Sequence, residues 1–191
     1  MEAFIWSSGA VALAEIGDKT QLLAFVLAAR FRRPWPIIWA ILLATIANHG
    51  VAALLGEWLS ELVSPQTLKY LVGASFIGMG LWILVPDKLE EETVEHADWG
   101  VFLATFVAFF LAEIGDKTQI ATIALAAHYQ SLVAVVMGTT LGMMLANVPA
   151  VILGDRATGL VSVRLVHSIA ALMFIGLGLA VLLGFDGWGT S

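Results

Sequence analysis

The chain has 191 residues, of which 60% are hydrophobic and only 13% are charged, and its mean hydropathy is +0.92. These values exclude an ordinary soluble globular protein and are typical of a polytopic helical protein embedded in a lipid bilayer. The formal net charge of −6 argues against a nucleic-acid partner, and the absence of cysteine excludes disulfides and thiolate metal sites.

Six apolar runs are long enough to cross a bilayer, since a transmembrane helix needs about 20 residues. They cover residues 3–29, 35–56, 68–85, 99–128, 131–153 and 165–184. The sequence therefore predicts an all-α integral membrane protein with six transmembrane helices. The first and fourth runs are the long ones, and each contains a glycine flanked by charge, where a helix can bend or break.

The same nine residues, LAEIGDKTQ, occur in both long runs, at 13–21 and again at 111–119. The third and sixth runs also match, because FIGMGL at 76–81 corresponds to FIGLGL at 174–179 with the same offset of 98 residues. The glycines of these copies are predicted to be helix-packing surfaces.

These matches define a repeat unit of three helices. Because three is an odd number, the second copy is predicted to be inverted in the membrane relative to the first. The chain is then divided into a first repeat at 1–85, an acidic linker at 86–98 and a second repeat at 99–191.

The distribution of basic residues outside the motifs predicts the orientation, since cytoplasmic loops carry an excess of Lys and Arg. One side of the predicted membrane has only Lys69. The other side has Arg30, Arg32, Arg33, Lys88, Arg156 and Arg164. Both termini are therefore expected outside the cytoplasm and the linker inside. The linker is expected to be a solvated connection, and the alternative is a cation-gathering or regulatory segment.

Charged residues are costly at membrane depth, so a repeated cluster of them predicts an ion site between the two copies. Its predicted ligands are the carboxylates of Glu15, Asp18, Glu113 and Asp116 and the amide oxygens of Asn48 and Asn147. Oxygen ligands suit hard ions such as Ca²⁺, Mn²⁺ or Mg²⁺. The four carboxylates and the two motif lysines carry a formal charge of −2, which balances one divalent cation or two protons.

The remaining motif residues are predicted to assist this site. On a continuous helix the Glu, Asp and Lys of each motif would share one face. The lysines would neutralise the site between ion passages, and the threonines would act as secondary ligands or bond to the preceding turn. The glutamines are less well aligned with that face. The auxiliary residues are Lys19, Thr20, Gln21, Lys117, Thr118 and Gln119.

A structural alternative pairs Glu15 with Lys19 and Glu113 with Lys117 as buried ion pairs. It is disfavoured because it would leave two aspartates unpaired in hydrocarbon.

Neighbouring polar residues have alternatives of their own. Asn48 and Asn147 could instead form interhelical hydrogen bonds. His49 is predicted to be structural, because the second repeat has Val148 at the matching position.

Two copies of Glu-x-Gly-Asp-Lys-Thr in a six-helix chain of this length resemble the transmembrane family of Golgi manganese and calcium transporters and bacterial manganese exporters, within the cation/calcium exchanger group. The resemblance covers essentially the whole chain. It implies that Glu15, Asp18, Glu113 and Asp116 form the metal site. It also implies a bacterial plasma membrane protein that expels Mn²⁺, since the long leader and extended central loop of eukaryotic members are not seen.

The predicted function is therefore a secondary transporter that exports a divalent cation, most simply Mn²⁺, in exchange for protons and without a prosthetic group. A Ca²⁺/H⁺ antiporter of the same architecture is the main alternative. A passive cation channel, an exporter of a small organic cation and a membrane-embedded metalloenzyme are less favoured. The enzyme lacks support because no dedicated nucleophile or His-rich site accompanies the acids.

Overall fold

The computed structural model describes residues 1–85, 100–153 and 163–184. This part of the chain forms eight helices and contains no strand. The expected acidic linker at 86–98 lies outside the described residues, and so do Lys88 and Arg156.

Proline and small polar residues set the helix boundaries. Pro34 and Pro65 each occupy the first position of a helix, where the missing N–H costs nothing, and Ser64 caps the second of these helices by accepting from the Thr67 N–H at 3.2 Å. The helices are α1 (Glu2–Glu15), α2 (Lys19–Phe31), α3 (Pro34–Leu62), α4 (Pro65–Ile83), α5 (Val101–Glu113), α6 (Lys117–Tyr129), α7 (Leu132–Leu153) and α8 (Val163–Leu183).

The first and fourth predicted spans are each broken into two helices. Gly17 and Gly115 have φ angles of 85° and 74°, which L side chains rarely adopt, and they lie between α1 and α2 and between α5 and α6. The prediction that the motif glycines interrupt the helices is confirmed. The prediction that the motif residues share the face of one continuous helix is wrong, because the helix stops inside each motif.

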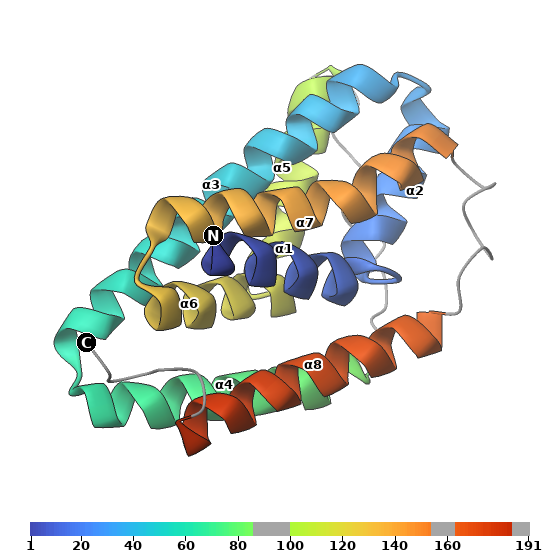
Figure 1. Ribbon diagram of the computed structural model, residues 1–191. Coiled ribbons are helices and arrows are strands. Elements are labelled where there is room, and N and C mark those ends of the chain that lie inside the picture. The colour runs from blue at the N-terminus through green and yellow to red at the C-terminus, as the bar shows by residue number, and fades with distance from the viewer. Residues whose placement is uncertain (86–99, 154–162, 185–191) are drawn as a thin grey trace.

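The third helices of the two predicted repeats pack along each other. Figure 1 shows α4 and α8 side by side along one edge of the molecule. Phe76 and Phe174 occupy matching positions, and their buried rings lie 6.1 Å apart between centroids. A Cβ atom at Gly178 would lie 2.7 Å from the Gly73 carbonyl oxygen, and one at Gly80 would meet the α8 backbone equally closely. Gly80 and Gly178 therefore are helix-packing surfaces, as predicted, whereas the prediction is wrong for Gly78 and Gly176, where a Cβ atom would meet nothing within 4 Å.

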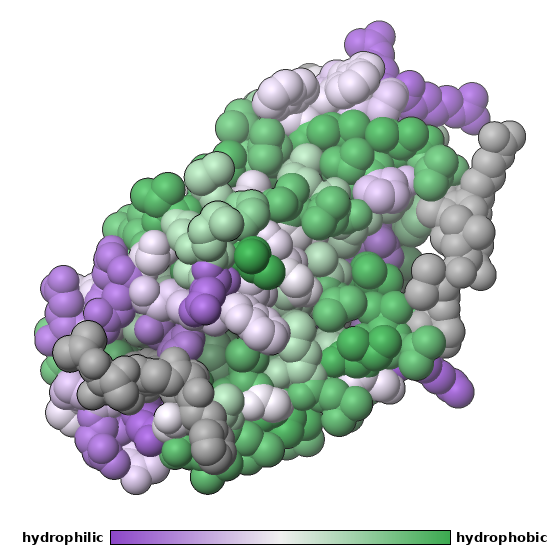
Figure 2. Space-filling view, viewed as in Figure 1, coloured by the Kyte–Doolittle hydropathy of each residue, from purple (hydrophilic) through white to green (hydrophobic). Residues whose placement is uncertain are grey.

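The surface of the described helices is that of a membrane protein. Hydrophobic residues cover most of the face in Figure 2, while hydrophilic residues gather mainly toward the ends of the molecule. Within the described residues, α3, α7 and α8 are long and apolar enough to cross a membrane, and α5 is a shorter apolar helix. The chain is thus an all-helical membrane protein.

Candidate metal site

Both motif copies fold into the same local structure. In each, the glycine N–H donates to the side-chain Oε1 of the glutamine four residues later, at 2.8 Å in both copies. The aspartate N–H donates to the carbonyl oxygen of the preceding glutamate, at 3.0 Å for Asp18 and 3.1 Å for Asp116. Each glutamate is consequently the last residue of one helix, and each aspartate lies at the N-cap of the next helix. Gln21 and Gln119 thus stabilise the break.

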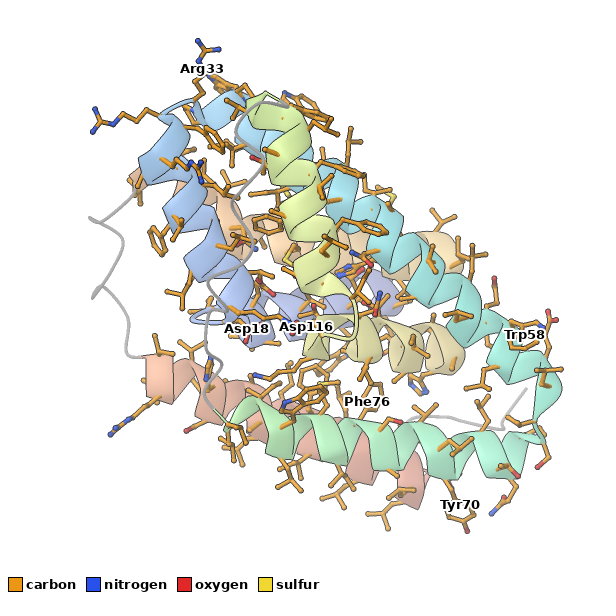
Figure 3. All side chains as sticks on the ribbon, turned by 180° about the vertical axis from the view of Figure 1, so that it is seen from behind. Asp18, Arg33, Trp58, Tyr70, Phe76 and Asp116 are labelled. Atoms are coloured by element: carbon orange, nitrogen blue, oxygen red, sulfur yellow. The ribbon has the colours of Figure 1, made fainter. Side chains whose placement is uncertain are left out.

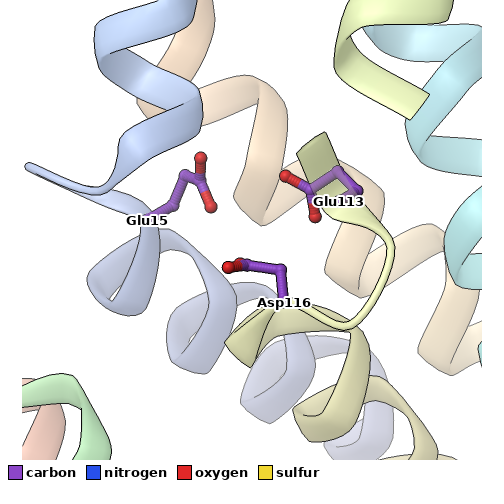
Figure 4. Close-up of side chains that lie close together, drawn as sticks. All are labelled: Glu15, Glu113 and Asp116. Atoms are coloured by element: carbon purple, nitrogen blue, oxygen red, sulfur yellow. The ribbon is translucent and has the colours of Figure 1, made fainter. Parts of the chain in front are cut away.

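Three of the four predicted acids meet at the centre of the described structure. Glu15, Glu113 and Asp116 each contribute one carboxylate oxygen, and these oxygens all lie within 4.8 Å of one another. Figure 4 shows the three side chains converging from the ends of α1 and α5 and the start of α6. All three are buried, with at most 3% exposure. Buried acids in such proximity are the donor set of a site for a hard cation.

The lysines pair across the two motif copies. Lys19 Nζ lies 2.9 Å from Asp116 Oδ1, and Lys117 Nζ lies 3.4 Å from Asp18 Oδ1. In the view of Figure 3 both aspartates lie toward the middle of the molecule. The alternative in which each lysine pairs with the glutamate of its own motif is therefore wrong, because the helix break turns each lysine toward the other copy. Neither aspartate is left unpaired.

This arrangement divides the charge unequally. Asp18 is compensated by Lys117, whose side chain is 2% exposed and lies 3.4 Å from the Val85 carbonyl oxygen. Among the described residues, the lysine that pairs with the three converging carboxylates is Lys19, which contacts Asp116 and is 28% exposed. With all groups ionised, the three acids and Lys19 carry a formal charge of −2. A divalent cation at the three acids would therefore balance the charge.

The asparagines contact the site in different ways. Asn147 Nδ2 donates to Glu15 Oε1 at 3.2 Å, so its amide lies directly against one of the three acids. Asn48 Nδ2 donates to the Phe110 carbonyl oxygen, and its Oδ1 accepts from Gln119 Nε2, both at 2.9 Å. The amide oxygen of Asn48 is therefore engaged, which supports the alternative of an interhelical hydrogen bond for this residue.

The motif threonines are buried beside the acids. Thr118 Oγ1 donates to Glu113 Oε2 at 2.9 Å and lies 3.3 Å from Asp116 Oδ2. It thus orients two of the three carboxylates rather than bonding to the preceding turn. Thr20 is fully buried on the opposite motif.

Two histidines lie beside the motif residues, although the sequence predicts only a structural role for His49. His49 on α3 is fully buried, and its Nε2 lies 4.0 Å from Glu113 Oε2. His167 on α8 has its Nε2 2.7 Å from the Ile16 carbonyl oxygen, within the first helix break. The repeat pattern concealed His49, and its position directly after Asn48 was no signal of its own, because consecutive residues of a helix do not share a face.

Comparison with known proteins identifies the family. The model of the family described as "Divalent cation/proton antiporter GDT1" matches residues 3–91 and 101–187. A Vibrio cholerae protein named "Putative manganese exporter" is 52% identical over 172 residues, covering 89% of this chain and 85% of that protein. No solved structure gave a significant match.

More distant relatives carry the family name. A GDT1-like protein of Synechocystis is 31% identical over 86% of this chain and 88% of its own length. GDT1-like protein 4 of Oryza sativa subsp. indica is also 31% identical, over 94% of this chain and 72% of its own. The family is one of transporters and not of enzymes, which agrees with a repeated, charge-balanced acid cluster inside a membrane protein. The chain belongs to the divalent cation/proton antiporter GDT1 family.

Proposed function

We propose that this protein exports Mn²⁺ across the bacterial plasma membrane in exchange for protons, and that Glu15, Glu113 and Asp116 bind the metal. The observation that carries this proposal is the convergence of three buried carboxylates beside Lys19. Such a group is stable when a cation or protons neutralise it. Metal and protons would then compete for the same oxygens, which is the basis of exchange.

The chemistry of the site admits manganese, and the name of one relative favours it. The three carboxylates provide hard oxygen ligands, which suit Mn²⁺, Ca²⁺ and Mg²⁺. The name of the Vibrio cholerae relative specifies manganese. A Ca²⁺/H⁺ antiporter with the same three acids is the second candidate, and it differs only in the cation that the site prefers.

The architecture that we propose has six spans in two inverted repeats at 1–85 and 99–191, joined by a cytoplasmic linker at 86–98. The first and fourth spans would be the helix pairs α1 with α2 and α5 with α6. The equal geometry of the two motif breaks supports the repeat. The basic residues Arg30, Arg32 and Arg33 after α2 favour a cytoplasmic position for this end, with both termini outside.

Transport would proceed by alternating access. In the described residues, α4 packs on α6 and α8 packs on α1, whereas neither shows comparable packing on α2 or α5. Lys117, on the α6 side, is 2% exposed, and Lys19, on the α2 side, is 28% exposed. We infer that in this conformation the metal site is closed to the outer side of the membrane and accessible from the cytoplasm. In the opposite conformation Asp18 would take the place of Asp116, because the motifs are equivalent.

Proton coupling follows from the charge of the site. Since the three acids and Lys19 carry −2, loss of Mn²⁺ would be balanced by uptake of two protons. Low external pH would therefore promote release of metal, and higher internal pH would promote its recruitment. Exchange of two protons for one Mn²⁺ would be electroneutral.

Metal flux in proteoliposomes tests the proposal. We expect Mn²⁺ flux that follows an imposed pH gradient, is insensitive to membrane potential and is lost in Asp116→Asn. Flux that ignores the pH gradient would favour a passive channel. Ca²⁺ flux with little Mn²⁺ flux would favour the second candidate, and flux of neither metal would overturn the assignment of the site.

A further inference from the structure

His49 is a buried histidine for which the described residues provide no hydrogen-bond partner. Its side chain is fully buried on α3, and neither ring nitrogen has a partner within the described structure. The nearest charged group is Glu113, with 4.0 Å between Nε2 and Oε2. This separation is too long for a hydrogen bond. The imidazole therefore faces an acid of the site without bonding to it.

A simple structural role for His49 is hard to reconcile with this geometry. Burying a polar group without a hydrogen bond costs about 1–3 kcal/mol in proteins. The opposing Glu113 Oε2 already accepts from Thr118 Oγ1 at 2.9 Å, and Thr118 also orients Asp116. An atom that binds both Nε2 and the carboxylate would satisfy the imidazole without displacing the threonine.

A metal ion fits the separation of the two groups. Ligand atoms about 2.1 Å from an ion and on opposite sides of it stand about 4.2 Å apart. The measured 4.0 Å between His49 Nε2 and Glu113 Oε2 is close to this value. Glu113 belongs to the group of three acids, so a cation between the two atoms would be linked to that group through Glu113, while His49 itself lies outside the group.

We propose that His49 is a nitrogen ligand of the transported metal and is the residue that makes the site discriminate against Ca²⁺ and Mg²⁺. This inference rests on the proposed function, since it concerns the same site. Calcium and magnesium take oxygen ligands, whereas imidazole binds first-row transition ions. The acids supply affinity for any hard divalent cation, and one nitrogen shifts the preference toward Mn²⁺ and Fe²⁺.

The proposed nitrogen ligand comes from the first repeat alone. The position that matches His49 in the second repeat is Val148, and there Asn147 Nδ2 contacts Glu15 instead. The acids are thus duplicated, but the nitrogen is not. A site with a single nitrogen among oxygens favours a borderline ion over Ca²⁺ without becoming the nitrogen-rich site typical of zinc.

Pulsed electron paramagnetic resonance of Mn²⁺ bound to the purified wild-type protein is the direct test. Coupling of the Mn²⁺ electron spin to a directly bound ¹⁴N nucleus is expected in the wild type and should be absent in His49→Gln. This variant keeps a polar side chain of similar length and offers an oxygen ligand. Because the wild-type spectrum alone can refute the inference, the test does not depend on the variant folding.

Selectivity provides the second measurement. The ratio of the Ca²⁺ to the Mn²⁺ dissociation constant should fall about tenfold in His49→Gln, the lower end of the effect of altering metal-site residues. The matched control is His167→Gln, which removes a histidine that contacts the Ile16 carbonyl and none of the three acids.

The outcomes separate this inference from the proposed function. Mn²⁺ transport by the wild type without ¹⁴N coupling, or an unchanged selectivity ratio in folded His49→Gln, would overturn the role of His49 and leave the exporter intact. Absence of Mn²⁺ binding and flux in the wild type would overturn both.

Discussion

Replacement of Lys19 by methionine should tighten Mn²⁺ binding and should lower the stability of the metal-free protein. Lys19 Nζ lies 2.9 Å from Asp116 Oδ1, and Asp116 is one of the three acids that we assign to the metal. A bound cation must compete with the ammonium group for this carboxylate. Methionine keeps the length of the side chain and removes the charge.

The magnitude follows from the distance. At an effective dielectric constant of about 20, two unit charges 2.9 Å apart attract by about 6 kcal/mol. Desolvation and the 28% exposure of Lys19 cancel much of this gain. If removal of Lys19 makes Mn²⁺ binding more favourable by a quarter to a half of this attraction energy, the Mn²⁺ dissociation constant falls by about 10- to 100-fold. Without metal, an unpaired Asp116 should cost about 3 kcal/mol of stability.

Isothermal titration calorimetry and thermal unfolding measure the two effects separately. Lys19→Met should have a lower melting temperature than wild type without Mn²⁺ and a larger upward shift on its addition. Transport should be slower, because a more tightly held ion is released more slowly. Lys19→Arg keeps the charge and is the matched control. Weaker Mn²⁺ binding in Lys19→Met, with Lys19→Arg normal, would refute the view that this lysine competes with the metal.

Three further predictions test the asymmetry of the site and the packing around it. Asp116→Asn should weaken Mn²⁺ binding at least tenfold, whereas Asp18→Asn should leave binding close to wild type, because Lys117 compensates Asp18 in this conformation. Both variants should lose transport. Equal losses of Mn²⁺ binding in the two variants would contradict the unequal division of charge. Because the chain has no cysteine, a single introduced cysteine can be labelled selectively. Lys19→Cys should react with a water-soluble thiol reagent added from the cytoplasmic side and Lys117→Cys should not, since the lysine side chains are 28% and 2% exposed. Faster labelling of Lys117→Cys would contradict the proposal that the site is accessible from the cytoplasm. Gly142→Ala should lower the free energy of unfolding by about 1–3 kcal/mol in a thermal unfolding assay, because its Cβ would lie 2.6 Å from a carbonyl oxygen of α1.

The control for the glycine variant is Gly78→Ala. A Cβ atom at Gly78 would meet nothing within 4 Å, so this variant should be as stable as wild type or slightly more stable. Equal destabilisation by the two alanines would mean that helix propensity, and not close packing of α1 on α7, governs the effect.

Much of the fold could be predicted from the sequence, because hydrophobic runs and glycines determine where helices form and break through local effects. The apolar runs predicted the helices, and Gly17 and Gly115 indicated where the motif helices are interrupted. The pairing of Lys19 with Asp116 was not predicted. Spacing within a motif describes contacts on one continuous helix, whereas the break redirects each lysine toward the other copy.

The candidate site was predicted in composition better than in geometry. Three of the four acids have carboxylate oxygens within 4.8 Å of one another, while Asp18 pairs with Lys117, a difference that two identical motifs cannot reveal. The sequence predicts a structural role for His49, because this residue lacks a counterpart in the second repeat. Repeat symmetry finds the residues that the two halves share, and it overlooks a residue by which they differ.

The crossed ion pairs also bear on how the protein is made. When the first motif enters the membrane during synthesis, Asp116 and Lys117, which pair with Lys19 and Asp18 in the folded protein, have not yet been translated. Two charges would therefore wait in or near the bilayer, at a cost of several kcal/mol, until the second motif arrives. The crossed ion pairs would therefore form only after the second motif has been made. A chain that stalls before residue 117 would keep the features by which membrane quality control recognises an unfinished protein.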